Sequence, residues 1–119
     1  MYEVIMYEDK KGNCQADDFL EGMLVKRRAK IEKWIEQLEK EGPDLPRPYA
    51  DIVQGKIREL RVQFGSDNYR FLYFFFEKKI IITHGFFKKT KKVSVSEINK
   101  ATKIMKDFLK RIKEGEILL

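Results

Sequence analysis

The sequence of 119 residues contains one cysteine, Cys14, and one histidine, His84. A single cysteine cannot form an internal disulfide, and no histidine stands near Cys14 in the sequence to activate it as a nucleophile. Zinc sites need several cysteine or histidine ligands, and the chain also lacks a glycine-rich phosphate-binding loop. We therefore expect no metal and no cofactor, and a hydroxyl–histidine–aspartate triad would have only His84 to build on.

Long apolar segments are also missing. The longest candidate, residues 73–82, is interrupted by Glu77 and two lysines, whereas a helix needs about 20 apolar residues to span a bilayer. The N-terminus lacks the basic-then-apolar pattern of a secretion signal, so we expect a cytoplasmic protein without a membrane partner. The prolines all lie between residues 43 and 48, and no stretch resembles a long flexible linker. We expect a single domain over residues 1–119.

Positive charge is what the chain has in excess. Lysine and arginine number 25 against 19 acidic residues, which gives a net charge of +6 and a pI near 9.4. The segment from Lys88 to Lys113 carries more positive charge than the chain as a whole. Such a balance favours a nucleic acid, an acidic protein or an anionic membrane surface as partner, and charge alone does not rank them.

Alternation of apolar and polar residues predicts strands at 2–7, 57–64 and 69–76, with a further strand leading to a basic exit at Thr90. The turn residues 65–68 predict a hairpin in which Phe64 pairs with Tyr69. In that register Arg61 and Arg70 lie diagonally on one face of the sheet, roughly 7 Å apart at their backbones. Two converging guanidinium groups would form a phosphate site.

Helices are predicted both before and after the strands of residues 57–90 in the sequence. Asp17 or Asp18 can cap a short helix, and a longer one with a buried stripe from Ile31 to Leu38 stops at Gly42-Pro43. The proline-containing segment 42–54 is expected to be irregular, and a capping box at Ser94–Glu97 begins a C-terminal helix. We predict an α+β fold: a small, mostly antiparallel sheet of about four strands with an N-terminal helical hairpin on one face and a C-terminal helix.

The chemistry open to such a cationic face is RNA cleavage without metal. RNA carries its own nucleophile, the 2′-hydroxyl, and arginines match phosphate oxygens with two parallel donors. We expect Arg61 and Arg70 to stabilise the phosphorane, and proton transfer to involve His84, Glu59 or a lysine of lowered pKa. The candidate catalytic residues are therefore Arg61, Arg70, His84 and Lys88, and the candidate RNA-binding residues are Lys89, Lys91, Lys92, Arg47, Tyr73 and Phe86, the last two as base-stacking rings.

The same residues have ordinary structural interpretations, which the pattern leaves open. Arg61 can be an exposed strand residue paired with Glu59, Arg70 a structural partner of a carboxylate, and His84 a hydrogen-bonded residue of the sheet. Trp34 lies in the helix stripe and is interpreted as a core residue rather than a base-stacking one.

Short motifs occur in a set order along the chain: Leu45-Pro46, Asp51-Ile52, Gly55, Glu59-Leu60-Arg61, Tyr69-Arg70, Leu72-Tyr73, His84-Gly85-Phe86, Lys88-Lys89-Thr90, and Glu97-Ile98 with Ala101. Together they resemble the phage-derived Gp49-like branch of the HigB toxins in the RelE/ParE superfamily. The resemblance implies a RelE-like fold and a toxin that cleaves mRNA on the ribosome and is neutralised by a helix-turn-helix antitoxin. It also implies that Arg61 and Arg70 handle phosphate, with Lys88 and Lys89 contributing from the basic segment.

Three other functions remain open at this point. One is a non-catalytic module that binds RNA or the ribosome, the second is a gyrase inhibitor like the ParE branch of the superfamily, and the third is a protein that only binds a partner. No tyrosine or histidine stands near the C-terminus to act as an acid or base, as some relatives use, so the group that transfers the proton is not fixed by the motifs.

Overall fold

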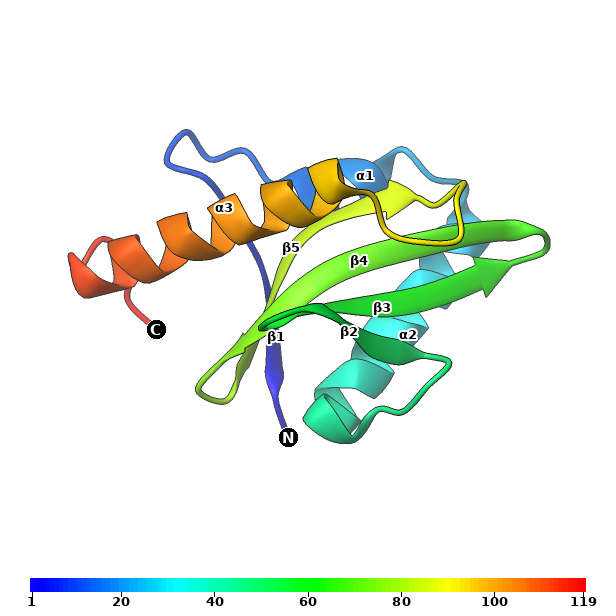
Figure 1. The fold of residues 1–119 in the computed structure, drawn as a ribbon, viewed down its shortest axis with the longest axis horizontal. Coiled ribbons are helices and arrows are strands. Elements are labelled where there is room, and N and C mark those ends of the chain that lie inside the picture. Colours follow the sequence, from blue (N-terminus) through cyan, green and yellow to red (C-terminus); the bar gives the residue numbers. More distant parts are fainter.

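A five-stranded sheet forms the centre of the computed structural model, which describes residues 1–119 (Figure 1). Its strands lie in the order β1-β5-β4-β3-β2, and β1 runs parallel to β5 while the other neighbours are antiparallel. In chain order the strands are β1 (Glu3–Met6), β2 (Ala50–Gln54), β3 (Ile57–Phe64), β4 (Asp67–Phe76) and β5 (Lys79–Phe87).

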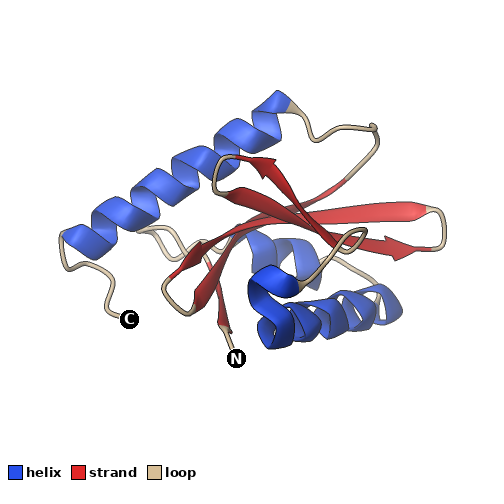
Figure 2. Ribbon diagram, turned by 60° about the horizontal axis from the view of Figure 1, so that its bottom comes forward, coloured by secondary structure: helices blue, strands red, loops and turns tan.

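Helices cover both faces of the sheet (Figure 2). They are α1 (Gln15–Glu21), α2 (Val25–Glu41) and α3 (Val95–Lys113), with a 3-10 turn, η1, at Gly42–Asp44. The α+β class is confirmed. The expected hairpin of two N-terminal helices is right only in part: both cover one face, but α1 packs on β5 and α2 mainly on β3. None of the helices is both long and apolar enough to cross a bilayer.

The alternation of residues along the strands explains the two layers of core. Leu60 and Val62 of β3 are buried beneath α2, together with Phe71 of β4. Leu72 and Phe74 of β4 point the other way and are buried beneath α3, where the ring of Phe74 meets that of Phe108 edge to face at 5.6 Å. Glu59 and Arg61 of β3 and Arg70 of β4 alternate with the residues beneath α2 and therefore lie on the face that α3 covers.

The fifth strand, β2, is the main departure from the predicted fold. Residues 42–54 were expected to be irregular because proline lacks a backbone amide, but the prolines end at Pro48 and β2 begins at Ala50. Ala50 pairs with Leu60, and the pairing continues to Ile57 through an irregularity between Ile52 and Gln54. Arg61 to Phe64 of β3 extend beyond β2.

The predicted register of the β3–β4 hairpin is wrong by two residues. Phe64 pairs with Asp67 rather than with Tyr69, because only Gly65 and Ser66 form the turn. Gly65 has a φ of +62°, a conformation that glycine adopts without steric cost and that suits a two-residue hairpin turn. A shift of two residues leaves every side chain on its expected face, and it places Arg61 directly opposite Arg70.

The capping box of α3 is half formed. The Ser94 hydroxyl accepts a hydrogen bond from the backbone amide of Glu97 at 3.3 Å, as predicted, but the Glu97 carboxylate lies against His84 of β5. At α1 the capping position is Cys14, which makes no side-chain cap, while Asp17 and Asp18 lie within the first turn. Their negative charges suit the helix N-terminus there without capping it.

Candidate functional site

Two arginines on neighbouring strands form the centre of the candidate site. Arg61 of β3 and Arg70 of β4 are direct cross-strand partners, and Phe86 of β5 is the next residue in the same row. Side chains of such a row lie on one face of the sheet, closer together than in the diagonal arrangement that we expected. This face is the one covered by α3 further along the strands.

Carboxylates hold both guanidinium groups. Glu59, which is 5 % exposed, places Oε1 at 2.8 Å from Arg70 Nε and Oε2 at 3.3 Å from Arg61 Nη2. Asp51 of β2 lies 3.3 Å from the same Arg61 nitrogen and 2.9 Å from Nε of Arg47. Cations and anions thus alternate across three strands, and a phosphate entering the site must compete with these carboxylates for the arginines.

Some polar atoms in this group of ion-paired side chains nevertheless have no hydrogen-bond partner. Four buried side-chain atoms lack one in the whole chain, and three of them are Glu59 Oε1, Arg61 Nε and Arg70 Nε. The close contact between Glu59 and Arg70 is therefore an ion pair without hydrogen-bond alignment. Buried unsatisfied groups are rare in proteins, and their concentration here marks this cluster as a functional candidate.

Burial affects the ionisation of the site. Arg70 is 9 % exposed, and burial lowers its pKa, an effect that the charge of Glu59 opposes. Lys88 follows β5 and donates its backbone N–H to the carbonyl of Asn68 at 2.8 Å. Burial lowers the pKa of Lys88, and the positive charge of Arg70 lowers it further. Lys88 therefore releases its proton more readily than an exposed lysine.

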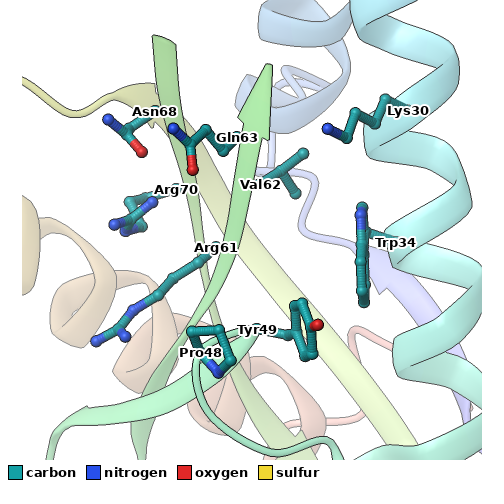
Figure 3. Close-up of a pocket in the computed structure, with 9 residues that line it drawn as sticks. All are labelled: Lys30, Trp34, Pro48, Tyr49, Arg61, Val62, Gln63, Asn68 and Arg70. Atoms are coloured by element: carbon teal, nitrogen blue, oxygen red, sulfur yellow. The ribbon is translucent and has the colours of Figure 1, made fainter. Parts of the chain in front are cut away.

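Three hollows meet at these cations. The first, which we call the edge pocket, has a volume of about 320 Å³ and is lined by Lys30, Trp34, Pro48, Tyr49, Arg61, Val62, Gln63, Asn68 and Arg70 (Figure 3). The second, of about 270 Å³, is lined among others by Glu59, Arg61 and Lys88. The third, of about 330 Å³, contains Arg70 and Lys88. Arg61, Arg70 and Lys88 each line two of the three hollows, so a ligand in any one hollow contacts two of these three cations.

The basic loop that leaves β5 contributes the other predicted RNA-binding lysines. Lys89 and Lys91 line the third hollow beside Arg70, and Lys91 and Lys92 line the second beside Arg61. Arg47 is largely exposed and reaches the cluster through its ion pair with Asp51. Phe86 is half-buried in the arginine row. The structure brings all of these predicted residues to one region of the surface.

Two predicted site residues are not available to a ligand. Tyr73 is 1 % exposed and belongs to the core on the α2 face, so its expected role in base stacking is withdrawn. His84 is also 1 % exposed. Its Nε2 lies 3.1 Å from Glu97 Oε1 and its Nδ1 3.0 Å from Thr83 Oγ1. Burial lowers the pKa of His84, and Glu97 opposes this. His84 joins β5 to α3, and we remove it from the catalytic candidates.

Sequence reasoning missed Asp51, Asn68 and the stacking of Trp34 on Tyr49. The spacing of Arg47 and Asp51, four residues apart, was a usable signal for an ion pair. Trp34 was correctly interpreted as part of the helix stripe, but its ring also lines the edge pocket. No three histidine, cysteine, aspartate or glutamate side chains converge as they would around a metal ion.

The fold and the site define a small α+β protein whose sheet carries a pair of arginines. The buried carboxylate of Glu59 forms ion pairs with both arginines, and a lysine-rich loop lies beside them. A family model described as phage-derived protein Gp49-like (DUF891) matches residues 18–106. The chain therefore belongs to the Gp49-like family, which confirms that part of the resemblance seen in the motifs. The matched region contains Arg61, Arg70 and Lys88. A comparison with curated proteins finds no match.

Proposed function

We propose that this protein is the toxin of a type II toxin–antitoxin system, of the HigB type within the RelE/ParE superfamily. In this proposal it is an endoribonuclease that cleaves mRNA on the ribosome without a metal ion. Membership of the Gp49-like family is compatible with a toxin nuclease. The observation that carries the proposal is the convergence of Arg61, Arg70 and Lys88 where three hollows meet.

The reaction that we assign to Arg61, Arg70 and Lys88 is attack by the RNA 2′-hydroxyl on its neighbouring phosphorus. A bond forms between the 2′-oxygen and phosphorus while the 2′-hydroxyl proton passes to solvent water, and the bond to the 5′-oxygen breaks. The products are a 2′,3′-cyclic phosphate and a 5′-hydroxyl. Arg61 and Arg70 donate hydrogen bonds to the non-bridging oxygens, where charge grows in the transition state. Lys88, with its lowered pKa, is the candidate that protonates the leaving 5′-oxygen.

The loop lysines and Arg47 have a different task in this mechanism. Lys89, Lys91 and Lys92 are exposed, and exposed cations along a groove hold the phosphate backbone by displacing its counterions. They set affinity for RNA rather than the rate of scission. Phe86 is half-buried beside them and is the remaining predicted ring for contact with a base.

The test is cleavage of mRNA in a translation extract, with mapping of the cut ends. Arg61→Ala and Lys88→Ala should each lower the rate about 100- to 1000-fold, the usual effect of removing a group that stabilises transition-state charge, as Arg61 does, or transfers a proton, as Lys88 does. Arg61→Lys tests whether the two-donor fork is needed or charge is sufficient. Lys103→Ala, an exposed lysine of α3, is the matched control and should cleave like the wild type. Equal cleavage by all four variants would exclude this site.

A specific observation favours a second function, a non-catalytic module that binds RNA or the ribosome. Arg70 is nearly buried and both arginines already have carboxylate partners, which is also the arrangement of a structural ion-pair network. Wild-type protein that binds ribosomes but leaves mRNA intact would support this module. Loss of DNA supercoiling with intact transcripts would instead indicate a ParE-like gyrase inhibitor.

The proposed partner is a helix-turn-helix antitoxin. Its expected gene is the reading frame beside the one for this protein, and co-expression of that product should restore the growth of cells in which this protein is induced. If induction alone leaves growth unchanged, the protein is not a toxin.

A further inference from the structure

Two aromatic rings form one wall of the edge pocket. Trp34 of α2 and Tyr49, which precedes β2, are stacked with their centroids 4.5 Å apart and their planes inclined by 20°. Tyr49 is 40 % exposed and Trp34 is half-buried, so the pair is not sealed within the core. Both rings line the edge pocket.

The wall lies beside the free edge of β3. β2 pairs with β3 only as far as Leu60, and the backbone N–H of Arg61 donates to the carbonyl of Tyr49 at 2.8 Å. Beyond that bond, Val62 to Phe64 have no strand on this side. The edge pocket therefore straddles the strand: Figure 3 shows the Arg61 and Arg70 side chains on one side of β3, with Trp34 and Tyr49 on the helix side.

The lining of the pocket selects the chemistry of its occupant. It contains Lys30, Arg61 and Arg70 but no acidic residue, and it adds the amides of Gln63 and Asn68. Sites for single-stranded nucleic acid are built from cations that face phosphate, an aromatic wall, and a few amides able to hydrogen-bond a base edge. The pocket volume of about 320 Å³ is within the range of small-ligand sites.

We propose that the edge pocket binds one nucleobase of the RNA, placed against the Trp34–Tyr49 wall while the adjoining phosphate contacts Arg61 and Arg70. This inference rests on the proposed function and adds to it the place where the substrate base is held. An added peptide strand is the less suitable occupant, because only Val62 to Phe64 are free at this edge, fewer than the roughly five or six residues of the commonest strands.

The chain offers a direct readout, because Trp34 is its only tryptophan. The probe is a short single-stranded RNA with 2′-O-methyl groups throughout, which removes the nucleophile and leaves the bases and phosphates. Stacking of a base at the wall should quench tryptophan fluorescence as the probe saturates the protein. The same oligonucleotide with a single abasic site, moved along the sequence, should lose the quenching at one position and bind about 5- to 150-fold more weakly there.

Matched variants separate stacking from folding. Tyr49→Phe keeps the ring and should bind the probe within about twofold of the wild type, whereas Tyr49→Leu should weaken binding by about 5- to 150-fold. Both variants are to be compared at temperatures where circular dichroism shows them folded. Equal binding by the phenylalanine and leucine variants would overturn the proposal.

The proposal and the proposed function fail in different ways. One outcome is that the probe binds in a mobility-shift assay, with binding abolished by Arg61→Ala, while the fluorescence of Trp34 does not change. In that case the base lies elsewhere, and the proposed ribonuclease activity is not contradicted. If an acidic peptide perturbs Trp34 and the probe does not, the edge pocket is a peptide groove and the base site is refuted. Failure of the proposed function itself is read from the cleavage assay, which does not depend on Trp34.

Discussion

Glu59→Gln is the substitution that most directly tests how the arginine pair is held. The Glu59 and Arg70 side chains are 6 % and 10 % exposed, so the change leaves a buried guanidinium without its counterion. Removing one partner of a buried pair costs about 3–5 kcal/mol. Arg70 Nη1 keeps its bond to the Tyr69 carbonyl at 3.1 Å, and the glutamine carbonyl can still accept, so we expect a loss of about 2–3 kcal/mol.

The same substitution should strengthen the response to phosphate. In the wild type an anion must displace Glu59 from the arginines, whereas in the variant Arg70 has no carboxylate partner and the anion supplies its only compensating charge. A ligand that binds the folded state alone stabilises it by about 2.7 kcal/mol at 100 times its dissociation constant. At equal concentrations of inorganic phosphate or RNA, the variant is therefore closer to saturation and gains more stability.

The assay is thermal unfolding followed by circular dichroism across a phosphate series. For a chain of this size the loss corresponds to a fall in Tm of about 8–12 °C without phosphate, and added phosphate should narrow the gap. Asp51→Asn is the control, since the pair of Asp51 with Arg61 is more exposed than the pair of Glu59 with Arg70, and it should shift Tm less. The reasoning is refuted if Glu59→Gln unfolds at the wild-type temperature, or if phosphate stabilises both proteins equally.

Three further predictions concern single residues. Gly85→Ala should lose about 1–3 kcal/mol of unfolding free energy in urea, because a Cβ would lie 2.4 Å from the Phe71 ring and 2.7 Å from that of Phe19; wild-type stability would contradict this packing. Because burial lowers the pKa of His84, its proton binds the unfolded chain better, so stability should hold above about pH 6.5 and fall below it. His84→Phe should flatten that fall in urea titrations. Cleavage should decline as pH rises through the lowered pKa of Lys88, and Lys88→Arg should move the decline to higher pH in a pH–rate profile.

The faces of the sheet could be predicted from the sequence because alternation has a period of two. The hairpin turn was assigned two residues too many, yet an even shift preserves which side chains share a face. Arg61 and Arg70 were therefore placed on the same side of the sheet despite the wrong register. An error of one residue would have separated them, and nothing in the residues 65–68 alone distinguishes the two cases.

The features that were missed depend on partners distant in sequence. β2 is recognisable as a strand only once β3 provides its ladder, because Asp51 and Gln54 interrupt its apolar pattern. The burial of His84 follows from Glu97, which reaches it from the first turn of α3. In the same way the depth of Glu59 beneath both arginines follows from the arrangement of three strands. Local pattern gives the direction of a side chain but not what covers it.

The carboxylate beneath the arginines resolves a conflict in the fold. Like charges directly opposite each other on neighbouring strands destabilise a sheet, and Lys88 adds a third cation to Arg61 and Arg70. Glu59 makes this arrangement compatible with a folded protein in the absence of a ligand, and it also reduces the attraction of the arginines for a distant anion. The exposed lysines of the loop after β5 form no ion pair with a carboxylate of the chain. They are therefore the groups that attract RNA from solution. The arginines act at short range, once a phosphate is near enough to compete with Glu59.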